Sequence, residues 1–324
     1  MEVRNMNKYR HTEGFKRYYT LDYFYKQQFQ TKICKISLNG GFTCPNLDGV
    51  SGYGGCIYCS KLGSGEFAGN QQDDLVDQFH TVAKMMKQKW PQAKYIGYFQ
   101  ARTNTYAPVA ELKDKYERIL NQENVIGLSI ATRADAISDD CYDYLEELAT
   151  RTYLTVELGL QTIHPKTSAL INRCHSLTCF EQAVKELRKR NINVVVHIIN
   201  GLPHETKEMM IATTNYLNQF DIQGIKIHML SVLTDTPLAT YYQKAPFSIL
   251  TKEEYIEIVC DQLERLNPEF VIHRITGDPK REDLITPNWL LKKFVVINDI
   301  DKELKRRDTY QGIYYNNINK KSNL

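Results

Sequence analysis

The sequence contains no apolar run that approaches the roughly twenty residues needed for a membrane-spanning helix. Its first residues, Met-Glu-Val-Arg-Asn-Met-Asn-Lys, lack the apolar stretch of a secretory signal peptide. Eight cysteines in 324 residues, most of them scattered, do not form the dense framework of a disulfide-stapled domain. We therefore expect a protein of a reducing compartment, the cytoplasm, with no membrane partner.

The sequence also has little excess charge, because 41 lysines and arginines are nearly balanced by 38 aspartates and glutamates, which gives a net charge of +3. So small a balance does not by itself indicate a nucleic-acid partner. No low-complexity segment or short repeat interrupts the chain. With 324 residues, the sequence is long enough for one large α/β domain or two smaller ones.

What the sequence does contain is a loop with three closely spaced cysteines, Cys44, Cys56 and Cys59. Three thiolates can hold a four-iron cluster and leave its fourth iron without a protein ligand, which makes that iron a reaction site. Four glycines between residues 49 and 55 allow the backbone to approach a bulky inorganic group. Zinc needs a fourth ligand within reach, but the next histidine is His80 and the next cysteine is Cys141. The pattern favours an iron–sulfur cluster over a zinc site.

Short apolar runs recur at intervals of about thirty to forty residues, the length of a strand, a helix and two loops. Segments with helical spacing of apolar residues lie between these runs, as over residues 75–86. The runs cover residues 34–38, 95–100, 125–131, 153–160, 194–200 and 225–233. Alternation of this kind predicts an α/β fold with parallel strands inside and helices outside.

Capping residues mark several helix starts. Thr251 with Glu254, and Thr178 with Glu181, have the spacing of a capping box, in which each side chain bonds the backbone of the other residue. Ser138 directly precedes two aspartates and is a suitable N-cap residue. We therefore expect helices to begin at these three places.

The stretch from Lys35 to Ala68 resembles the YhcC-type radical S-adenosylmethionine (radical SAM) proteins, relatives of the catalytic subunit of Elongator. It contains Cys-Pro-Asn-Leu-Asp-Gly, Gly-Gly-Cys-Ile-Tyr-Cys-Ser and Gly-Ser-Gly-Glu-Phe-Ala, and the long gap between Cys44 and Cys56 is typical of this branch. The resemblance implies an open (β/α)6 partial TIM-type barrel, to which the six apolar runs correspond. We expect this core over residues 31–240, with a basic and aromatic N-terminal extension over 1–30 and a family-specific C-terminal extension over 241–324.

The resemblance implies two cofactors, a [4Fe-4S] cluster held by Cys44, Cys56 and Cys59, and S-adenosylmethionine bound to the open iron. An electron donor such as flavodoxin or ferredoxin would reduce the cluster. Cleavage of S-adenosylmethionine would then give a 5′-deoxyadenosyl radical that removes hydrogen from the substrate. No second Cys-x-x-Cys pattern is present, so we expect no auxiliary cluster, and the sequence assigns no residue as catalytic.

Function in such a barrel gathers at the carboxyl ends of the strands. The residues that the resemblance implies there as cofactor ligands are Gln100, Thr103, Asn104, Arg133, Glu157, Gln161, Arg173 and Gly201. Structural alternatives stay open: a turn and helix cap after residue 100, an ion pair of Arg133 with Asp135 or Glu157, and a plain strand-to-helix turn at Gly201. Cys174 stands where the family's Arg-Gly-His segment has glycine, next to the polar candidate His175.

Two segments near the ends of the chain are rich in basic residues. The first interleaves Arg10, Lys16, Arg17 and Lys26 with Tyr9, Phe15, Tyr18, Tyr19, Tyr23, Phe24 and Tyr25, and the second contains Lys292, Lys293, Lys302, Lys305, Arg306 and Arg307. Basic groups can hold phosphates while aromatic rings stack on unpaired bases, so the two segments could form a cradle for a folded RNA. The alternatives are aromatic side chains packed on the outside of the barrel and the solvated face of a terminal helix.

The resemblance implies tRNA as the substrate, and similarity to the MnmL-like branch implies a wobble uridine. The reaction would convert 5-carboxymethylaminomethyluridine to 5-aminomethyluridine by removal of the carboxymethyl group. Two alternatives remain: radical SAM chemistry on a peptide or a small molecule, and a zinc-containing RNA-binding protein without catalytic activity.

Overall fold

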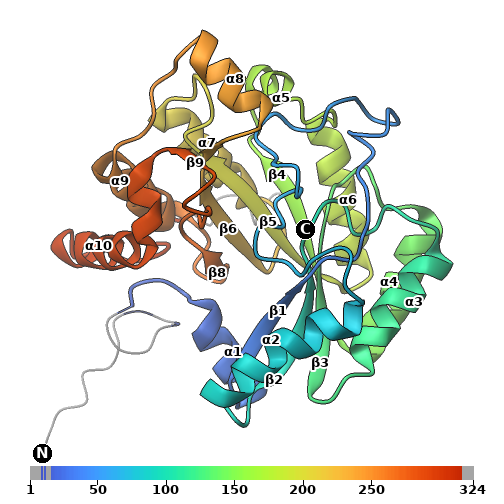
Figure 1. The fold of residues 1–324 in the computed structure, drawn as a ribbon. Helices are drawn as coiled ribbons and strands as arrows, with labels where there is room; N and C mark the ends of the chain where they lie inside the picture. The colour runs from blue at the N-terminus through green and yellow to red at the C-terminus, as the bar shows by residue number, and fades with distance from the viewer. Residues whose placement is uncertain (1–8, 10, 12–15, 316–324) are drawn as a thin grey trace, which may run out of the picture.

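The computed structural model describes Tyr9, His11 and residues 16–315. Seven parallel strands of this part form one curved sheet, in the order β1-β2-β3-β4-β5-β6-β8 (Figure 1). The strands are β1 (Ile33–Leu38), β2 (Lys94–Phe99), β3 (Val125–Thr132), β4 (Tyr153–Gln161), β5 (Asn193–Asn200), β6 (Gly224–Met229) and β8 (Val271–Arg274). A separate antiparallel pair consists of β7 (Val232–Leu233) and β9 (Leu284–Thr286).

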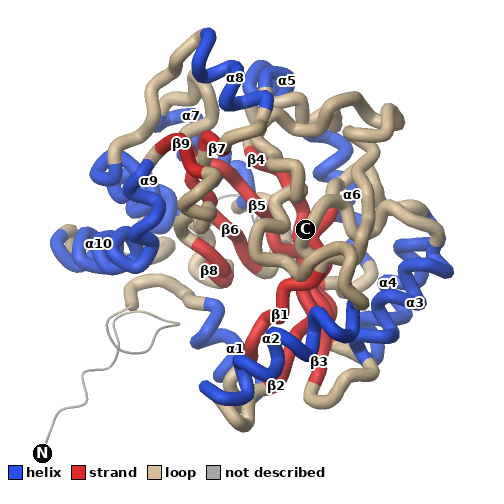
Figure 2. Tube along the Cα trace, in the orientation of Figure 1, coloured by secondary structure: helices blue, strands red, loops and turns tan. Residues whose placement is uncertain are grey.

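Helices cover the outer face of the curved sheet, as Figure 2 shows. The helices of the described residues are α1 (Leu21–Phe29), α2 (Leu75–Lys89), α3 (Val109–Leu120), α4 (Asp139–Arg151), α5 (Pro165–Leu170), α6 (Leu177–Lys189), α7 (Lys207–Leu217), α8 (Pro237–Lys244), α9 (Lys252–Arg265), the 3-10 helix η1 (Asn288–Lys292) and α10 (Lys293–Arg306). Of these, α1 lies at the amino-terminal end of the barrel and α8 contacts β7. No helix within the described residues is both long and apolar enough to span a bilayer.

The open partial barrel expected from the sequence is confirmed, with one strand more than the six predicted. The additional strand β8 pairs in parallel with β6 and lies within the segment assigned to the C-terminal extension. Its four residues include His273 and Arg274, so it does not stand out as an apolar run. The sixth predicted strand divides into β6 and β7, because the chain turns at Leu230, whose N–H donates to the carbonyl of Asn200.

The predicted helix starts differ in outcome. The capping box of Thr251 and Glu254 is present at the start of α9, with both reciprocal hydrogen bonds. The box predicted at Thr178 is wrong, because α6 begins two residues earlier, at Leu177, and Ser176 is its N-cap. The hydroxyl of Ser176 accepts a hydrogen bond from the N–H of Cys179 at 3.0 Å, and this places Thr178 inside the first turn. Ser138 precedes α4 as expected, although its side chain makes no capping bond to the backbone.

The aromatic N-terminal segment packs against the amino-terminal end of the barrel. Tyr25 of α1 is buried against Ile33 and Ile96, at the starts of β1 and β2. Phe29 meets Tyr153 of β4 edge to face, with ring centroids 5.1 Å apart. Burial of an aromatic side chain contributes about 1.5–3 kcal/mol, so these contacts hold α1 in place. For the residues described, packing is therefore the better interpretation of these aromatics, on the end opposite to the cysteine loop.

The basic groups of the same segment have acidic partners. Lys16 forms an ion pair with Asp301, and Arg17 bonds Asp308 at 3.1 Å. Two members of the predicted RNA-binding segment, Arg10 and Phe15, lie outside the described residues. The cations described here are thus used to join the N-terminal segment to the C-terminal part of the chain.

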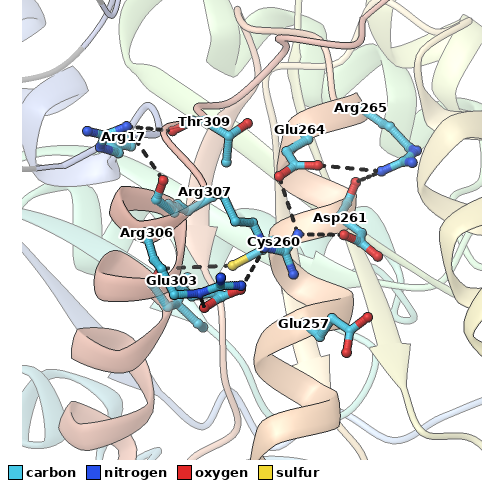
Figure 3. Close-up of polar contacts among 12 residues, drawn as sticks. Arg17, Glu257, Cys260, Asp261, Glu264, Arg265, Glu303, Arg306, Arg307 and Thr309 are labelled. Atoms are coloured by element: carbon cyan, nitrogen blue, oxygen red, sulfur yellow. Dashed lines mark hydrogen bonds and ion pairs between the residues drawn. The ribbon is translucent and has the colours of Figure 1, made fainter.

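The C-terminal basic stretch is likewise engaged, in a network between α9 and α10 (Figure 3). Arg307 donates to Asp261 at 2.6 Å, to Glu264 at 3.3 Å and to Glu303 at 2.7 Å. Arg306 also binds Glu303, at 2.7 Å. This arrangement favours the interpretation of the stretch as a helix face balanced by carboxylates over that of a free phosphate-binding surface.

Candidate active site

A cavity of about 610 Å³ opens at the carboxyl ends of the strands. One wall is formed by the loop of residues 39–74 between β1 and α2, which crosses the open end of the sheet (Figure 1). Cys44, Cys56 and Cys59 all line this cavity from the loop. The predicted cofactor ligands that line it as well are Gln100, Thr103, Arg133, Glu157, Gln161 and Arg173. The fold therefore brings the three thiols and most of the implied ligands to one space.

Two asparagines hold the cysteine loop in shape. Asn46 is completely buried, and its side-chain amide donates to the carbonyl of Asn172 at 2.6 Å and to Cys56 Sγ at 3.6 Å. Asn172, which follows α5, donates in turn to the carbonyls of Gly55 at 2.7 Å and Tyr53 at 2.9 Å. Neither asparagine was assigned a role from the sequence. The sequence does not reveal the role of these asparagines, because they join two segments that are far apart in the chain.

The glycines of the loop make room for its close packing. Gly54 has φ +77° and lines the cavity, and a Cβ built there would meet no atom within 4 Å. Gly52 does not have positive φ, but a Cβ there would lie 2.3 Å from Asn46 Oδ1 and 2.6 Å from Cys174 Sγ. Gly54 leaves the space beside the thiols open, whereas Gly52 allows the loop to contact the segment after α5.

The electrostatic surroundings favour thiolate formation at Cys56. The neighbouring Cys59 thiol and the amide of Asn46 both donate to it, and the Arg133 guanidinium lies nearby. These interactions outweigh burial and lower the pKa of Cys56 to about 6. A thiolate is the form that binds iron, so the donor set fits an iron–sulfur cluster.

A single zinc ion would place a different demand on its ligands. Zinc draws its ligand atoms to within about 2.0–2.3 Å of one point, whereas the thiolates of a four-iron cluster bind different irons and stay farther apart. No group of three His, Cys, Asp or Glu side chains that could hold one metal ion occurs between residues 16 and 315 or at His11.

Arg133 and Asp135, at the end of β3, form a bidentate ion pair with distances of 2.9 and 2.8 Å. Asp135 also accepts a hydrogen bond from Ser51 of the cysteine loop at 2.7 Å, and these interactions hold its pKa below the usual range despite burial. Of the alternatives left open by the sequence, the structure shows the pair with Asp135. Arg133 lines the cavity, but most of its donors are already occupied.

Arg173 is buried and donates only to backbone carbonyls. Its Nη1 atom lies 2.6 Å from the oxygens of both Leu160 and Thr162, at the end of β4. Its other nitrogens bond the carbonyl of His175 at 3.1 and 3.2 Å. Burial, with Arg173 and Arg133 nearby, lowers the pKa of His175 to about 4, so His175 is neutral at pH 7. Arg173 thus positions the end of β4, and the same residue also lines the cavity.

The remaining predicted ligands occupy different positions. Gln100 and Thr103 line the cavity, and Gln100 also donates to the carbonyl of Ser64 in the cysteine loop at 2.8 Å. Asn104 and Gly201 do not line the cavity. Asn104 is fully buried and donates to the Ala131 carbonyl at 2.7 Å, in keeping with the turn that was the alternative. The cofactor roles of Asn104 and Gly201 stay predictions without support from their positions.

Glu157 lies at the centre of a polar layer inside the barrel. Its carboxylate accepts from Lys35 of β1 at 2.5 Å, Ser129 of β3 at 2.6 Å and His197 of β5 at 2.7 Å, and also from Lys226 of β6. The two lysines are the charges that hold the pKa of Glu157 well below its usual range despite complete burial. A carboxylate offers about four acceptor positions, so these four donors leave little capacity for a cofactor hydroxyl.

Sequence reasoning missed this layer. It gave Lys226 no role, although Lys226 lines the cavity together with Tyr98, His197 and Arg274. Burial lowers the pKa of Lys226 to about 7, with Glu157 opposing the shift. A lysine inside an apolar strand was a usable signal, because a buried ammonium group needs a partner.

The local backbone at Cys174 has the shape that glycine would favour. Cys174 has φ +63°, in the left-handed region. The family pattern has glycine here, so the substitution keeps the backbone conformation at some cost in strain. Asn172, with φ 54°, has the same type of conformation.

A curved sheet of parallel strands, with a three-cysteine loop above a polar cavity at its open end, defines the class of radical SAM proteins. Residues 53–217 match the Radical SAM superfamily, and residues 222–306 match the Radical_SAM C-terminal domain. The chain belongs to the radical SAM superfamily, and its cofactors are a [4Fe-4S] cluster and S-adenosylmethionine. This membership sets aside the zinc-containing alternative.

Curated relatives define the branch. The chain is 49% identical over 316 residues to the uncharacterized protein YtqA of Bacillus subtilis, and the match covers 98% of each chain. It is 31% identical over 279 residues to the protein YhcC of Escherichia coli, covering 86% of this chain and 89% of YhcC. The protein is therefore a YhcC-type member of the superfamily.

More distant matches connect this branch with the Elongator subunit. A tRNA uridine(34) acetyltransferase of Methanocaldococcus infernus is 29% identical over 138 residues, which cover 41% of this chain and 25% of that protein. The solved structure of archaeal Elp3 from Methanocaldococcus infernus has the same fold, with a TM-score of 0.65 at 16% identity. The match covers 87% of this chain and 64% of the Elp3 chain.

Proposed function

We propose that the protein modifies the wobble uridine of tRNA, converting 5-carboxymethylaminomethyluridine to 5-aminomethyluridine by radical SAM chemistry. The main observation is the three-cysteine loop above a cavity lined by the ends of the barrel strands. The tRNA substrate is supported by the partial match to tRNA uridine(34) acetyltransferases and by the fold shared with Elp3. The particular modification rests on the resemblance of the sequence motifs.

In this proposal, Cys44, Cys56 and Cys59 hold the cluster, and Gln100, Thr103 and Gln161 contact S-adenosylmethionine across the cavity. All six side chains belong to residues that line the same space. Arg133 assists by favouring the thiolate of Cys56, one of the causes that lower its pKa. Arg173 positions the end of β4 through the carbonyls of Leu160 and Thr162.

The surface around the cavity is suited to bind a segment of unpaired RNA. Several apolar side chains of the cysteine loop are exposed, namely Leu47 at 37%, Val50 at 73%, Tyr53 at 79%, Leu62 at 47% and Phe67 at 53%. Phe67, Lys61 and Arg102 also line the cavity. Aromatic rings can stack on splayed bases while cations meet phosphates. We therefore place the RNA contact at this loop rather than at the basic termini.

The chemistry balances without an external oxidant. Held by Cys44, Cys56 and Cys59, the cluster with S-adenosylmethionine would supply two kinds of one-electron chemistry: formation of a 5′-deoxyadenosyl radical that would take a hydrogen atom from the methylene beside the substrate carboxylate, and acceptance of the electron that this carbon would then lose. Water then cleaves the resulting carbon–nitrogen double bond and leaves the amine, glyoxylate and a proton. The amine carries the aminomethyl group of the product, and no net electron is consumed.

The test is an anaerobic assay with the reconstituted, reduced protein and tRNA that carries 5-carboxymethylaminomethyluridine. We expect 5′-deoxyadenosine, 5-aminomethyluridine and glyoxylate to form in equal amounts. The Cys56→Ala variant should form none of them, because it lacks a cluster ligand. Cys179→Ala removes a thiol that does not line the cavity and should retain wild-type activity.

Each other result has a definite meaning. Formation of 5′-deoxyadenosine that does not depend on tRNA contradicts the tRNA substrate and favours the peptide or small-molecule alternative. An intact cluster that forms no 5′-deoxyadenosine contradicts the catalytic proposal as a whole.

A further inference from the structure

Arg274 at the end of β8 lines the cavity, and within the part of the chain that the structure describes its guanidinium group makes no hydrogen bond or ion pair. Among the residues from 16 to 315, no carboxylate, hydroxyl or carbonyl accepts a hydrogen bond from it, although it is half-buried. The other three arginines of the cavity wall differ in this respect: Arg102 donates to the carbonyl of Lys61, Arg133 is paired with Asp135, and Arg173 bonds three backbone carbonyls. A half-buried cation without a partner is costly unless an anion occupies the space beside it.

Lys226 of the neighbouring strand β6 faces the same space. Its ammonium group bonds Glu157 and the hydroxyl of Tyr98, the latter at 2.9 Å. An ammonium group has three donors, so one N–H remains for a ligand. The side chain is only 8% exposed and lines the cavity. Lys226 therefore offers a desolvated donor next to β8.

Positive charge exceeds negative charge in this part of the cavity. Glu157 is the carboxylate of the polar layer, and it faces the cations Lys35 and Arg274 as well as Lys226, which is partly protonated at pH 7 because burial lowers its pKa to about 7. Asp278 also lines the cavity, but it is paired with Lys293. The histidines do not change this balance, because burial lowers the pKa values of His197 and His228 and keeps both side chains neutral at pH 7. His228 Nε2 is buried without a partner in the described structure, which adds a polar atom in need of a ligand.

We propose that Arg274 and Lys226 form an anion-binding subsite at the floor of the cavity, which holds the carboxylate of the substrate. The proposal rests on the proposed function for the identity of that carboxylate, the one that 5-carboxymethylaminomethyluridine carries. A guanidinium group binds a carboxylate through two parallel hydrogen bonds and so fixes its orientation. Arg274 and Lys226 would then recognise the modified base and reject an unmodified uridine, which has no anion to present.

The test uses the holoenzyme with its cluster and S-adenosylmethionine, kept oxidised so that no turnover occurs. Equilibrium dialysis measures the Kd of the nucleoside 5-carboxymethylaminomethyluridine and of its methyl ester, which lacks the negative charge. We expect the wild-type protein to bind the acid at least about tenfold more tightly than the ester, the size of one charge-assisted hydrogen bond.

The variants separate Arg274 from general electrostatics. In Arg274→Gln, we expect the preference for the acid to fall below about threefold, and in Arg274→Lys we expect an intermediate value. Arg281→Gln removes an exposed arginine of the same segment that does not line the cavity, and it should retain the full preference. Because no residue between 16 and 315 accepts a hydrogen bond from Arg274, its replacement should not lower Tm.

Several results would overturn the subsite. These are failure of the wild-type protein to bind the acid, equal affinity for acid and ester, and an unchanged preference in Arg274→Gln. Loss of S-adenosylmethionine affinity in Arg274→Gln, measured without the nucleoside, would assign the guanidinium to the cofactor's carboxylate instead. If the acid is preferred but tRNA is not modified, the proposed function fails and the subsite stands. If tRNA is modified but the acid is not preferred over the ester, the subsite fails and the proposed function stands.

Discussion

Replacement of Glu157 by glutamine tests the polar layer most directly. The Glu157 side chain is 0% exposed and forms ion pairs with Lys35 and Lys226. Glu157→Gln keeps the shape of the side chain but leaves both lysines without a counter-charge. Loss of one partner of a buried ion pair costs about 3–5 kcal/mol. Lys226 can release its proton, since its pKa is already about 7, so we expect a loss near the lower end, about 3 kcal/mol.

The measurement is urea unfolding of the cluster-free protein at pH 7, followed by circular dichroism. The matched control is Glu147→Gln, because Glu147 pairs with Arg151 on the surface of α4 and its side chain is 54% exposed. An exposed pair of this kind contributes about 0.3–0.5 kcal/mol, so the control should unfold almost as the wild type does.

A second measurement separates the structural role of Glu157 from a cofactor role. Because its oxygens already accept from four protein donors, the folded Glu157→Gln variant should bind S-adenosylmethionine nearly as well as the wild type. A loss of stability below about 1 kcal/mol, together with a large loss of cofactor affinity, would refute this reasoning and return Glu157 to the role implied by the family resemblance.

Three further predictions concern other parts of the molecule. Arg307→Ala should lower the free energy of unfolding by about 1–3 kcal/mol, because it removes bonds to three carboxylates. The control Arg306→Ala should lower it by less than about 0.5 kcal/mol, and equal losses in urea unfolding would contradict the importance of the network. Cys174→Gly should raise the same free energy by about 0.5–1 kcal/mol, since glycine adopts φ +63° without strain; a decrease would contradict this. Burial lowers the pKa of His197 to about 4, so the unfolded protein binds more protons between pH 4 and 6.5 and stability falls as the pH is lowered through this range. His197→Asn should reduce that loss by up to about 3 kcal/mol, and an unchanged pH profile of unfolding would argue against it.

The cysteine spacing and the alternation of strands and helices were sufficient to predict the class of fold and the loop that carries the three cysteines. Both are local properties, since three thiols within sixteen residues and apolar runs with helical segments between them can be recognised without knowledge of contacts. The short strand β8 escaped prediction because its four residues include His273 and Arg274. Its place beside β6 is set by pairing, which a sequence of that length does not reveal.

The termini show the limit of composition as evidence. Basic and aromatic residues in the N-terminal segment are equally compatible with RNA binding and with packing. Only the folded chain placed Tyr25 against the starts of β1 and β2, and Lys16 beside Asp301. Burial and ion pairing depend on which distant residues become neighbours, so composition cannot separate these alternatives.

The sequence by itself determined the cysteine loop, the parallel architecture and the strand ends at which function gathers, because residue spacing and apolar periodicity are properties of short segments. Tertiary structure alone decided which inward-facing side chains share a layer. Lys35 and Lys226 lie 122 and 69 residues from Glu157 in the sequence, yet both contact its carboxylate. Periodicity indicates whether a strand residue faces inward, but the curvature of the sheet and the stagger of its strands bring these charges together. They also leave Arg274 facing the cavity with no hydrogen-bond acceptor among residues 16–315.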